Sequence, residues 1–198
     1  ILHPDITVKQ VYLKEYQEEF ISNYEVMRWD NQEVYDQMLA ACKEKGVEVL
    51  QALPADPWLF GDFTVQFFNT KPHREKKVGE NENAVGTKLT VRSYSAFLAA
   101  DINNIVGTED EIAPEIGRVD ILKLGHHGYT FSTTKKFVET LSPKISIVTN
   151  DRPASRVNGN SLLALLDAGS AIYTTGEHDG VIANLTGETI VLTENIHN

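Results

Sequence analysis

The sequence has little cysteine, little positive charge and no long apolar run, and each shortage disfavours a class of protein. Cys42 is the only cysteine in 198 residues, so the chain has no internal disulfide and no cysteine-based zinc cluster. Lys and Arg total 18 against 28 Asp and Glu, which gives a net charge of −10. Such a chain repels nucleic-acid phosphates and anionic membrane surfaces, so nucleic acid is disfavoured as a partner but not excluded. No apolar stretch approaches the roughly 20 residues of a membrane span.

What is present is an ordinary globular composition, with 41% hydrophobic and 23% charged residues. The length suits one domain with a sizeable core, and we see no internal repeat or linker, so residues 1–198 are expected to form a single domain. The first residue is Ile1 rather than Met, and no signal peptide is visible. We therefore expect a chain that was processed, trimmed or cut from a longer one.

Apolar periodicity predicts mainly strands, with helices between them in the second half. Helices are expected at 32–45, at 109–116, from Ser132 as N-cap to just before Pro143, and from Asn160 to Gly169. Strands are expected at 8–13, 47–53, 63–67, 89–91, 96–100, 119–124, 145–149, 171–174, 181–185 and 189–192. Strands that alternate with helices imply a sheet with helices on a face, which is the α/β class.

Chemically useful side chains follow two of these strands. Asp101 ends the run 96–100, and His126 and His127 follow the strand 119–124. Ligands of α/β sheets gather at the carboxyl ends of strands, a carboxylate is able to bridge two metals, and neutral imidazole is a good zinc ligand. Spacing alone leaves a second interpretation open, in which Asp101 is a turn or helix-cap residue and the histidines are exposed and inert.

The segments Phe97–Asp101 and Val119–Ser132 (FLAAD and VDILKLGHHGYTFS) together resemble the later part of a metallo-β-lactamase-fold hydrolase. The triplet Asn81-Glu82-Asn83 also resembles the segment that precedes the metal-binding Asp in one branch. That branch includes the extracellular hydrolase domains of DNA-uptake competence proteins and the phosphorylcholine esterase of teichoic acid. The resemblance is clearest over 81–193. It implies a metallo-β-lactamase-like αββα sandwich that lacks its N-terminal part.

The resemblance also implies roles for individual residues. Asp101 matches the metal-bridging aspartate, and His126 is the preferred candidate for the last metal ligand, with His127 as the alternative. The implied cofactor is a divalent metal, zinc first, as a two-metal site in the complete protein. The residues expected to line the substrate site are Tyr129, Thr130, Ser132, Asn150 and Asp151.

The chain departs from the family pattern in several places. The leading His-x-His-x-Asp-His motif, which supplies most of the metal ligands, is absent, and Ala100 stands where the family usually has Gly. His73 is a candidate for an additional ligand. We expect the missing ligands to precede Ile1 in a longer protein; the alternative is a natural remnant that binds no metal tightly.

The leading hypothesis is a metal-dependent hydrolase in which metal-bound hydroxide attacks a phosphoester, with Asp101 and His126 at the catalytic centre. The expected substrate is a small-molecule or cell-wall-type phosphoester, and a cell-surface location follows from the resemblance. The alternative is a non-catalytic binding domain that keeps the fold without a full metal site. A third hypothesis, an unrelated α/β domain, predicts that Asp101 and His126 lie far apart.

Overall fold

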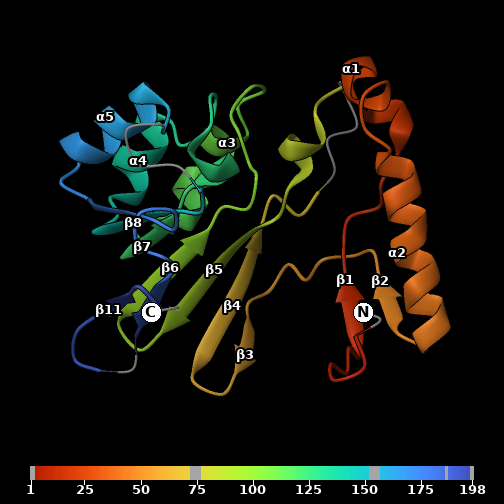
Figure 1. The fold of residues 1–198 in the computed structure, drawn as a ribbon, viewed down its shortest axis with the longest axis horizontal. Helices are drawn as coiled ribbons and strands as arrows, with labels where there is room; N and C mark the ends of the chain where they lie inside the picture. Colours follow the sequence, from red (N-terminus) through yellow and green to blue (C-terminus); the bar gives the residue numbers. More distant parts are fainter. Residues whose placement is uncertain (1–2, 72–76, 152–156, 186, 197–198) are drawn as a thin grey trace.

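The computed structural model describes residues 3–71, 77–151, 157–185 and 187–196, and its centre is a sheet of seven strands (Figure 1). In spatial order these are β3 (Trp58–Phe60), β4 (Phe63–Phe68), β5 (Gly86–Val91), β6 (Tyr94–Leu98), β7 (Ile121–Lys123), β8 (Ile145–Val148) and β9 (Ala171–Thr174). Strands β3 to β6 pair antiparallel, and β6 to β9 pair parallel. The mixed sheet confirms the predicted α/β class.

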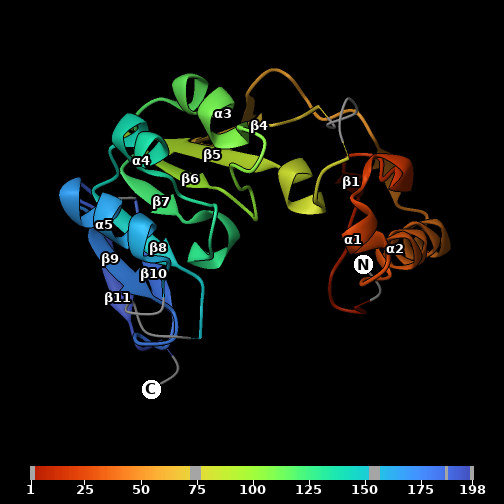
Figure 2. The same cartoon turned by 90° about the horizontal axis from the view of Figure 1, so that it is seen from above.

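Three helices supply the crossovers that parallel strands require. They are α3 (Thr108–Ile116), α4 (Lys135–Leu141) and α5 (Gly159–Asp167), and Figure 2 shows all three along one face of the sheet. The main core lies between that face and the helices, where Phe97, Leu122 and Leu165 are fully buried. The helix layer thereby fixes the half of the sheet that carries Asp101 and the two histidines.

The N-terminal residues form a second, smaller unit. Strands β1 (Gln10–Tyr12) and β2 (Glu48–Leu50) pair parallel, and α1 (Asn23–Val26) and α2 (Asn31–Lys45) connect them. In Figure 2 this unit lies on the opposite side of the sheet from α3 to α5, which gives the layer order α, β, β, α. Its β layer has only two strands among the residues that the structure describes.

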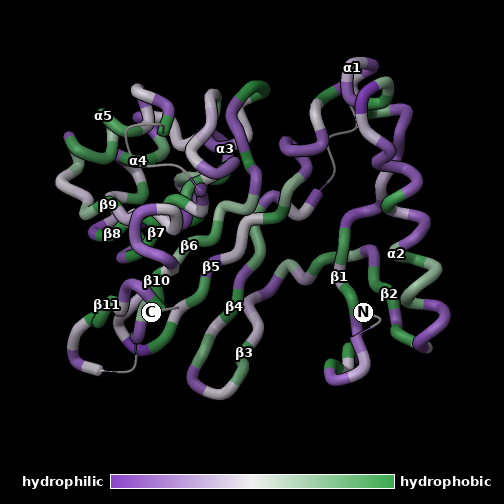
Figure 3. The backbone as a smooth tube through the Cα atoms, in the orientation of Figure 1, coloured by the Kyte–Doolittle hydropathy of each residue, from purple (hydrophilic) through white to green (hydrophobic). Residues whose placement is uncertain are grey.

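The two units differ in polarity and contact each other at several points, among them the backbone bridge between Ile21 and Val78. Figure 3 shows α2 mostly hydrophilic, whereas the central strands are mostly hydrophobic. Tyr12 of β1 packs edge-on against Trp58 of β3, with ring centroids 4.7 Å apart. A separate hairpin, β10 (Val181–Asn184) and β11 (Val191–Glu194), follows the large sheet. None of the helices in the described ranges has the length and apolarity of a membrane span.

Several element boundaries differ from the sequence predictions. The strand expected at 96–100 ends at Leu98, and a turn follows at Ala100 and Asp101. Helix α4 is capped by Thr134, whose side chain accepts a hydrogen bond from the Phe137 N–H, and not by Ser132. Strand β3 was not predicted, because three residues after two prolines give too short a pattern. The last strand lies two residues later than expected, at Val191–Glu194.

Candidate functional site

The candidate site forms where β6 and β7 end side by side. The two strands are parallel neighbours, with Leu98 paired to Lys123. Asp101 therefore follows one strand by three residues, and the turn η3 (Gly125–Gly128) follows the other by two. The His126 N–H donates to the Ala100 carbonyl at 3.1 Å, which ties the two segments together. Parallel pairing thus explains why residues 25 positions apart meet.

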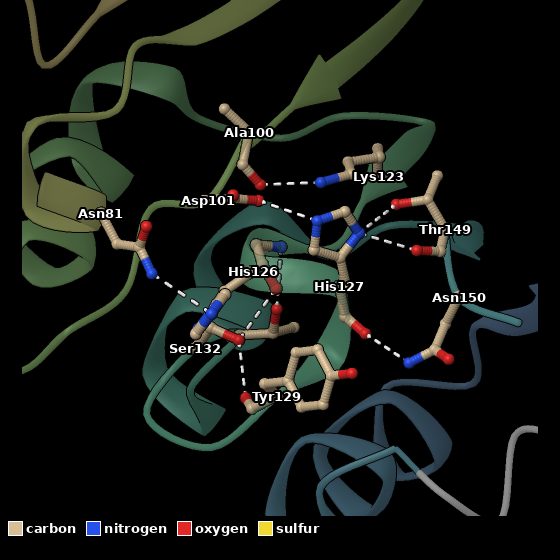
Figure 4. Close-up of polar contacts among 12 residues, drawn as sticks. Asn81, Ala100, Asp101, Lys123, His126, His127, Tyr129, Ser132, Thr149 and Asn150 are labelled. Carbon is tan, nitrogen blue, oxygen red and sulfur yellow. Dashed lines mark hydrogen bonds and ion pairs between the residues drawn. The ribbon is translucent and has the colours of Figure 1, made fainter. Parts of the chain in front are cut away.

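Asp101 and His127 form the closest acid–imidazole contact in this site (Figure 4). Asp101 Oδ1 lies 3.2 Å from His127 Nε2, and the two side chains are 43% and 41% exposed. His127 Nδ1 lies 2.7 Å from the Thr149 carbonyl. A carbonyl only accepts hydrogen bonds, so Nδ1 carries a proton. Nε2 faces the carboxylate, and this contact is favourable when Nε2 carries a second proton or binds a cation.

His126 lies in the same turn but points elsewhere. Its Nε2 lies 3.2 Å from the amide nitrogen of Asn81, and its Nδ1 is buried with no hydrogen-bond partner in the described part of the chain. Burial lowers the pKa of His126, an effect that Asp101 partly opposes. This shift favours the neutral form of the ring. The structure brings all three predicted residues together, but Asp101 contacts His127, whereas the sequence favoured His126 as the ligand.

The histidine turn has a strained backbone that its neighbours hold in place. His126 and His127 both have positive φ angles, 44° and 54°, a conformation that costs non-glycine residues of the order of 1 kcal/mol each. Gly125 is required because a Cβ there would lie 2.4 Å from the Ile102 carbonyl oxygen. The Ser132 hydroxyl donates to the Gly125 carbonyl at 2.9 Å. Strain of this kind persists where the surrounding structure enforces a special side-chain placement.

Lys123 is a site residue that sequence reasoning missed. Its ammonium donates to the Ala100 carbonyl at 2.7 Å and lies close to Asp101 in Figure 4. Burial lowers its pKa, and the Asp101 charge opposes that shift. The only sequence signal was a lysine near the end of a strand with two charged residues, VDILKL. Lys123 places a positive charge beside the carboxylate in an acidic chain.

The predicted lining residues divide into two groups. Tyr129 is 41% exposed, with its ring centroid 5.4 Å from that of His126, and the Asn150 amide donates to the His127 carbonyl at 3.3 Å. Thr130 and Ser132 instead line a groove of about 550 Å³ with α5 that includes neither histidine nor Asp101. Ser132 is 2% exposed, so its hydroxyl braces the loop.

Two remaining residues complete the placement of the predicted site. Asp151 is exposed, at the end of the segment that follows β8. His73, the candidate additional ligand, lies outside the described residues.

Ala100 gives a direct test of strain at the site. Its φ is +48°, which glycine adopts freely and alanine does not. We expect Ala100→Gly to raise the free energy of unfolding by about 0.5–1 kcal/mol, because relief of strain exceeds the entropy that glycine adds to the unfolded chain. Urea denaturation measures this. Ala99→Gly is the matched control: Ala99 is buried without a positive φ, so that variant loses stability. A loss in both variants would contradict the strain at Ala100.

A divalent metal fits the chemistry of this site but not its full ligand count. Asp101 Oδ1 and His127 Nε2 converge, and a backbone carbonyl holds the other nitrogen of the imidazole, as is usual for metal-binding histidines. However, the described ranges contain no group of three or more His, Cys, Asp or Glu side chains placed to hold a metal. Catalytic zinc ordinarily takes three protein ligands. The described residues therefore fall short of a complete metal site.

Comparison with known proteins gives one sequence relative and several partial structural likenesses. No family model matches the chain. Over 115 residues, 57% of this chain, it is 27% identical to ComE operon protein 3 from Bacillus subtilis (strain 168), and the match covers 14% of that relative's length. This relative fits the competence-protein branch named in the sequence analysis.

The solved structures are more distant. The metallo-β-lactamase fold protein YhfI from Bacillus subtilis is 12% identical, with 94% of this chain and 77% of that chain covered and a TM-score of 0.46. Igni18, a metallo hydrolase from Ignicoccus hospitalis, is 13% identical, with coverage of 84% and 75% and a TM-score of 0.40. TM-scores this low carry no functional information. Together with the ComE operon protein 3 match, the motifs around Asp101 and His126 make this chain similar to metallo-β-lactamase-fold proteins.

Proposed function

We propose that this chain contributes one side of the metal centre of a metal-dependent hydrolase that cleaves phosphoesters. The observation that carries the proposal is the 3.2 Å contact between Asp101 Oδ1 and His127 Nε2, with His127 Nδ1 bound to the Thr149 carbonyl. Two donors converge at adjacent strand ends, and both are partly exposed. This arrangement suits the binding of a cation, because a carboxylate oxygen and an imidazole nitrogen that face each other are both able to coordinate one.

Asp101 and His127 would hold the metal, and the remaining ligands would come from outside the described residues. A bound divalent metal supplies a Lewis acid and lowers the pKa of its water. Imidazole and carboxylate donors favour zinc within this class. The chain's own contribution is positional: the Thr149 carbonyl keeps a proton on His127 Nδ1, so that Nε2 faces Asp101. A cation and a proton compete for Nε2, so metal affinity should fall at low pH.

Lys123 and Tyr129 support an anionic substrate. The Lys123 ammonium uses one of its donors on the Ala100 carbonyl, and a partly buried cation attracts anions more strongly than an exposed one. The exposed Tyr129 ring lies beside both imidazoles, 5.4 Å from His126 and 6.5 Å from His127. A phosphoester offers the negative charge that Lys123 would bind. A cell-wall-type phosphoester and a cell-surface location remain predictions from the resemblance.

A second candidate function is a binding domain without turnover. The observation that favours it is the donor count, since no group of three metal-binding side chains occurs in the ranges that the structure describes. Under this alternative, Asp101 and Lys123 would recognise a ligand through charge alone. The two functions differ in their dependence on a metal.

Metal titration combined with a hydrolysis assay tests the proposal. Zn²⁺ and Mn²⁺ binding would be measured by calorimetry, and hydrolysis of bis(p-nitrophenyl) phosphate by absorbance, for the chain and its Asp101→Asn and His127→Gln variants. We expect each variant to lose at least about 10-fold in metal affinity, since even groups that only support metal ligands contribute that much. His178→Gln is the matched control, because His178 pairs with Glu194 in the hairpin.

The outcomes separate the two functions. Metal binding and hydrolysis that both fall in Asp101→Asn support the hydrolase. The absence of both metal binding and hydrolysis at any metal concentration supports the binding domain. Equal metal affinity in the chain, Asp101→Asn and His178→Gln would overturn the metal site itself.

A further inference from the structure

The turn η2 (Glu80–Asn83) precedes β5 and has no role in the function proposed above. Its sequence, Glu-Asn-Glu-Asn, is strongly polar, yet Glu82 is fully buried. A charged residue is almost never fully buried unless it is bonded. The turn lies beside the histidine turn η3, because Asn81 reaches His126 across 45 residues of sequence. The hydrogen bonds of the Glu82 carboxylate show which segments it connects.

Glu82 connects the turn to the segment that leaves Asp101. One carboxylate oxygen accepts a hydrogen bond from the Ile105 N–H at 3.0 Å, and the other accepts from the Thr108 hydroxyl at 2.6 Å. Ile105 lies in the loop after Asp101, and Thr108 is the first residue of α3. The carboxylate is thus satisfied on both oxygens, and it fixes the turn against the chain on one side of the site.

Asn69 holds the same turn from the opposite side. Its amide nitrogen donates to the Glu82 carbonyl at 2.7 Å and to the Ala84 carbonyl at 2.8 Å. Asn69 follows β4 directly and has a positive φ of 55°, which asparagine tolerates better than most residues. The turn is therefore held by the end of β4 on one side and by the start of α3 on the other.

The contacts of Glu82 and Asn69 hold the turn so that Asn81 lies beside the candidate site. Its amide nitrogen lies 3.2 Å from His126 Nε2 (Figure 4). An amide N–H only donates, so Nε2 accepts and the proton of the neutral ring lies on Nδ1. Nδ1 is buried and has no hydrogen-bond partner in the described part of the chain. Within those residues, no second hydrogen bond to the ring therefore determines which nitrogen carries the proton. Asn81 therefore makes the side-chain hydrogen bond to the His126 ring that the described part of the chain shows.

We propose that Asn81 is a positioning residue that fixes the ring and the tautomer of His126, and that Glu82 anchors the turn that carries it. The inference goes beyond the proposed hydrolysis, because it concerns the metal-free protein and holds whether or not the chain binds a metal. Its consequence is that His126 presents Nδ1–H to the interior and a hydrogen-bonded Nε2 to Asn81.

Nitrogen-15 NMR of histidine-labelled protein at pH 7.5 tests the inference, because a protonated and a bare ring nitrogen differ strongly in chemical shift. We expect the unaltered chain to show His126 with Nδ1 protonated and Nε2 bare. Asn81→Asp should reverse this, since a carboxylate only accepts and so requires a proton on Nε2. Asn81→Ala should give a mixture of tautomers. Asn83→Asp is the matched control, with the same charge change two residues along the turn, and should leave His126 unchanged.

Each result decides for or against the proposal. The unaltered chain with Nε2 protonated would overturn it before any variant is made. Asn81→Asp with Nε2 still bare, or Asn83→Asp with the same effect as Asn81→Asp, would also overturn it. For the anchor, Glu82→Gln keeps the shape of the side chain and should retain the tautomer, whereas Glu82→Ala should shift His126 toward the mixture seen in Asn81→Ala. An unchanged His126 in a folded Glu82→Ala variant would remove Glu82 from the proposal.

Discussion

Raising the pH from about 4.5 to about 7 is expected to lower the free energy of unfolding by about 3 kcal/mol through Glu109 alone. Glu109 lies on α3, is fully buried, and accepts hydrogen bonds from the Thr133 and Thr134 N–H groups. Burial raises the pKa of its carboxyl from 4.5 to about 7, more than these hydrogen bonds lower it. The folded chain therefore holds the proton that the unfolded chain releases above pH 4.5, so stability is lost through this window.

Urea denaturation at several pH values between 4 and 8 measures this slope, and Glu109→Gln should remove it, since glutamine does not titrate. Glu111→Gln is the control, because Glu111 is exposed on the same helix. An unchanged slope in Glu109→Gln would assign the pH dependence to other groups. The effect also concerns the site, because the Thr133 hydroxyl accepts a hydrogen bond from the Gly125 N–H next to His126.

Phe97→Ala is expected to destabilise the fold by about 3–5 kcal/mol, the usual cost of a large cavity in a core. Phe97 is fully buried, and its ring meets those of Phe68 and Phe137 edge-on, with centroids 5.8 and 6.1 Å away. The ring fills the space above Gly86, where a Cβ would lie 2.5 Å from it. Among the residues of the described core, only Phe97 contacts both the Phe68 ring and the Phe137 ring.

Thermal and urea unfolding measure this loss, and Phe60→Ala is the matched control. Phe60 lies on the edge strand β3 and is 56% exposed, so its removal should cost under about 1 kcal/mol. Equal losses in the two variants would show that the core does not centre on Phe97. Because β6 carries Phe97 and leads to Asp101, Phe97→Ala should also weaken any metal binding.

Local pattern was sufficient for most of the framework. The helix predicted at 32–45 is α2 (Asn31–Lys45), and Gly46 ends it in the left-handed conformation that C-terminal glycines favour. The alternation of Phe63, Val65 and Phe67 corresponds to β4. These features depend on residues only a few positions apart, so sequence patterns are sufficient to predict them. The cap of α4 was missed because Ser132 turns its hydroxyl to the Gly125 carbonyl, a contact that no local pattern reveals.

By itself, the sequence determined the α/β class, the placement of Asp101 and the two histidines after strands, and the net negative charge, because periodicity and charge are local or additive. Tertiary structure alone decided which groups meet. It turned His127 toward Asp101 and His126 toward Asn81, and it placed the partly buried Lys123 beside Asp101. It also placed the Glu82 carboxylate where it accepts hydrogen bonds from the Ile105 N–H and the Thr108 hydroxyl, more than 20 residues away in the sequence. These pairings depend on strand register and on positive φ angles in the histidine turn, which arise only when the whole sheet and its helices are assembled.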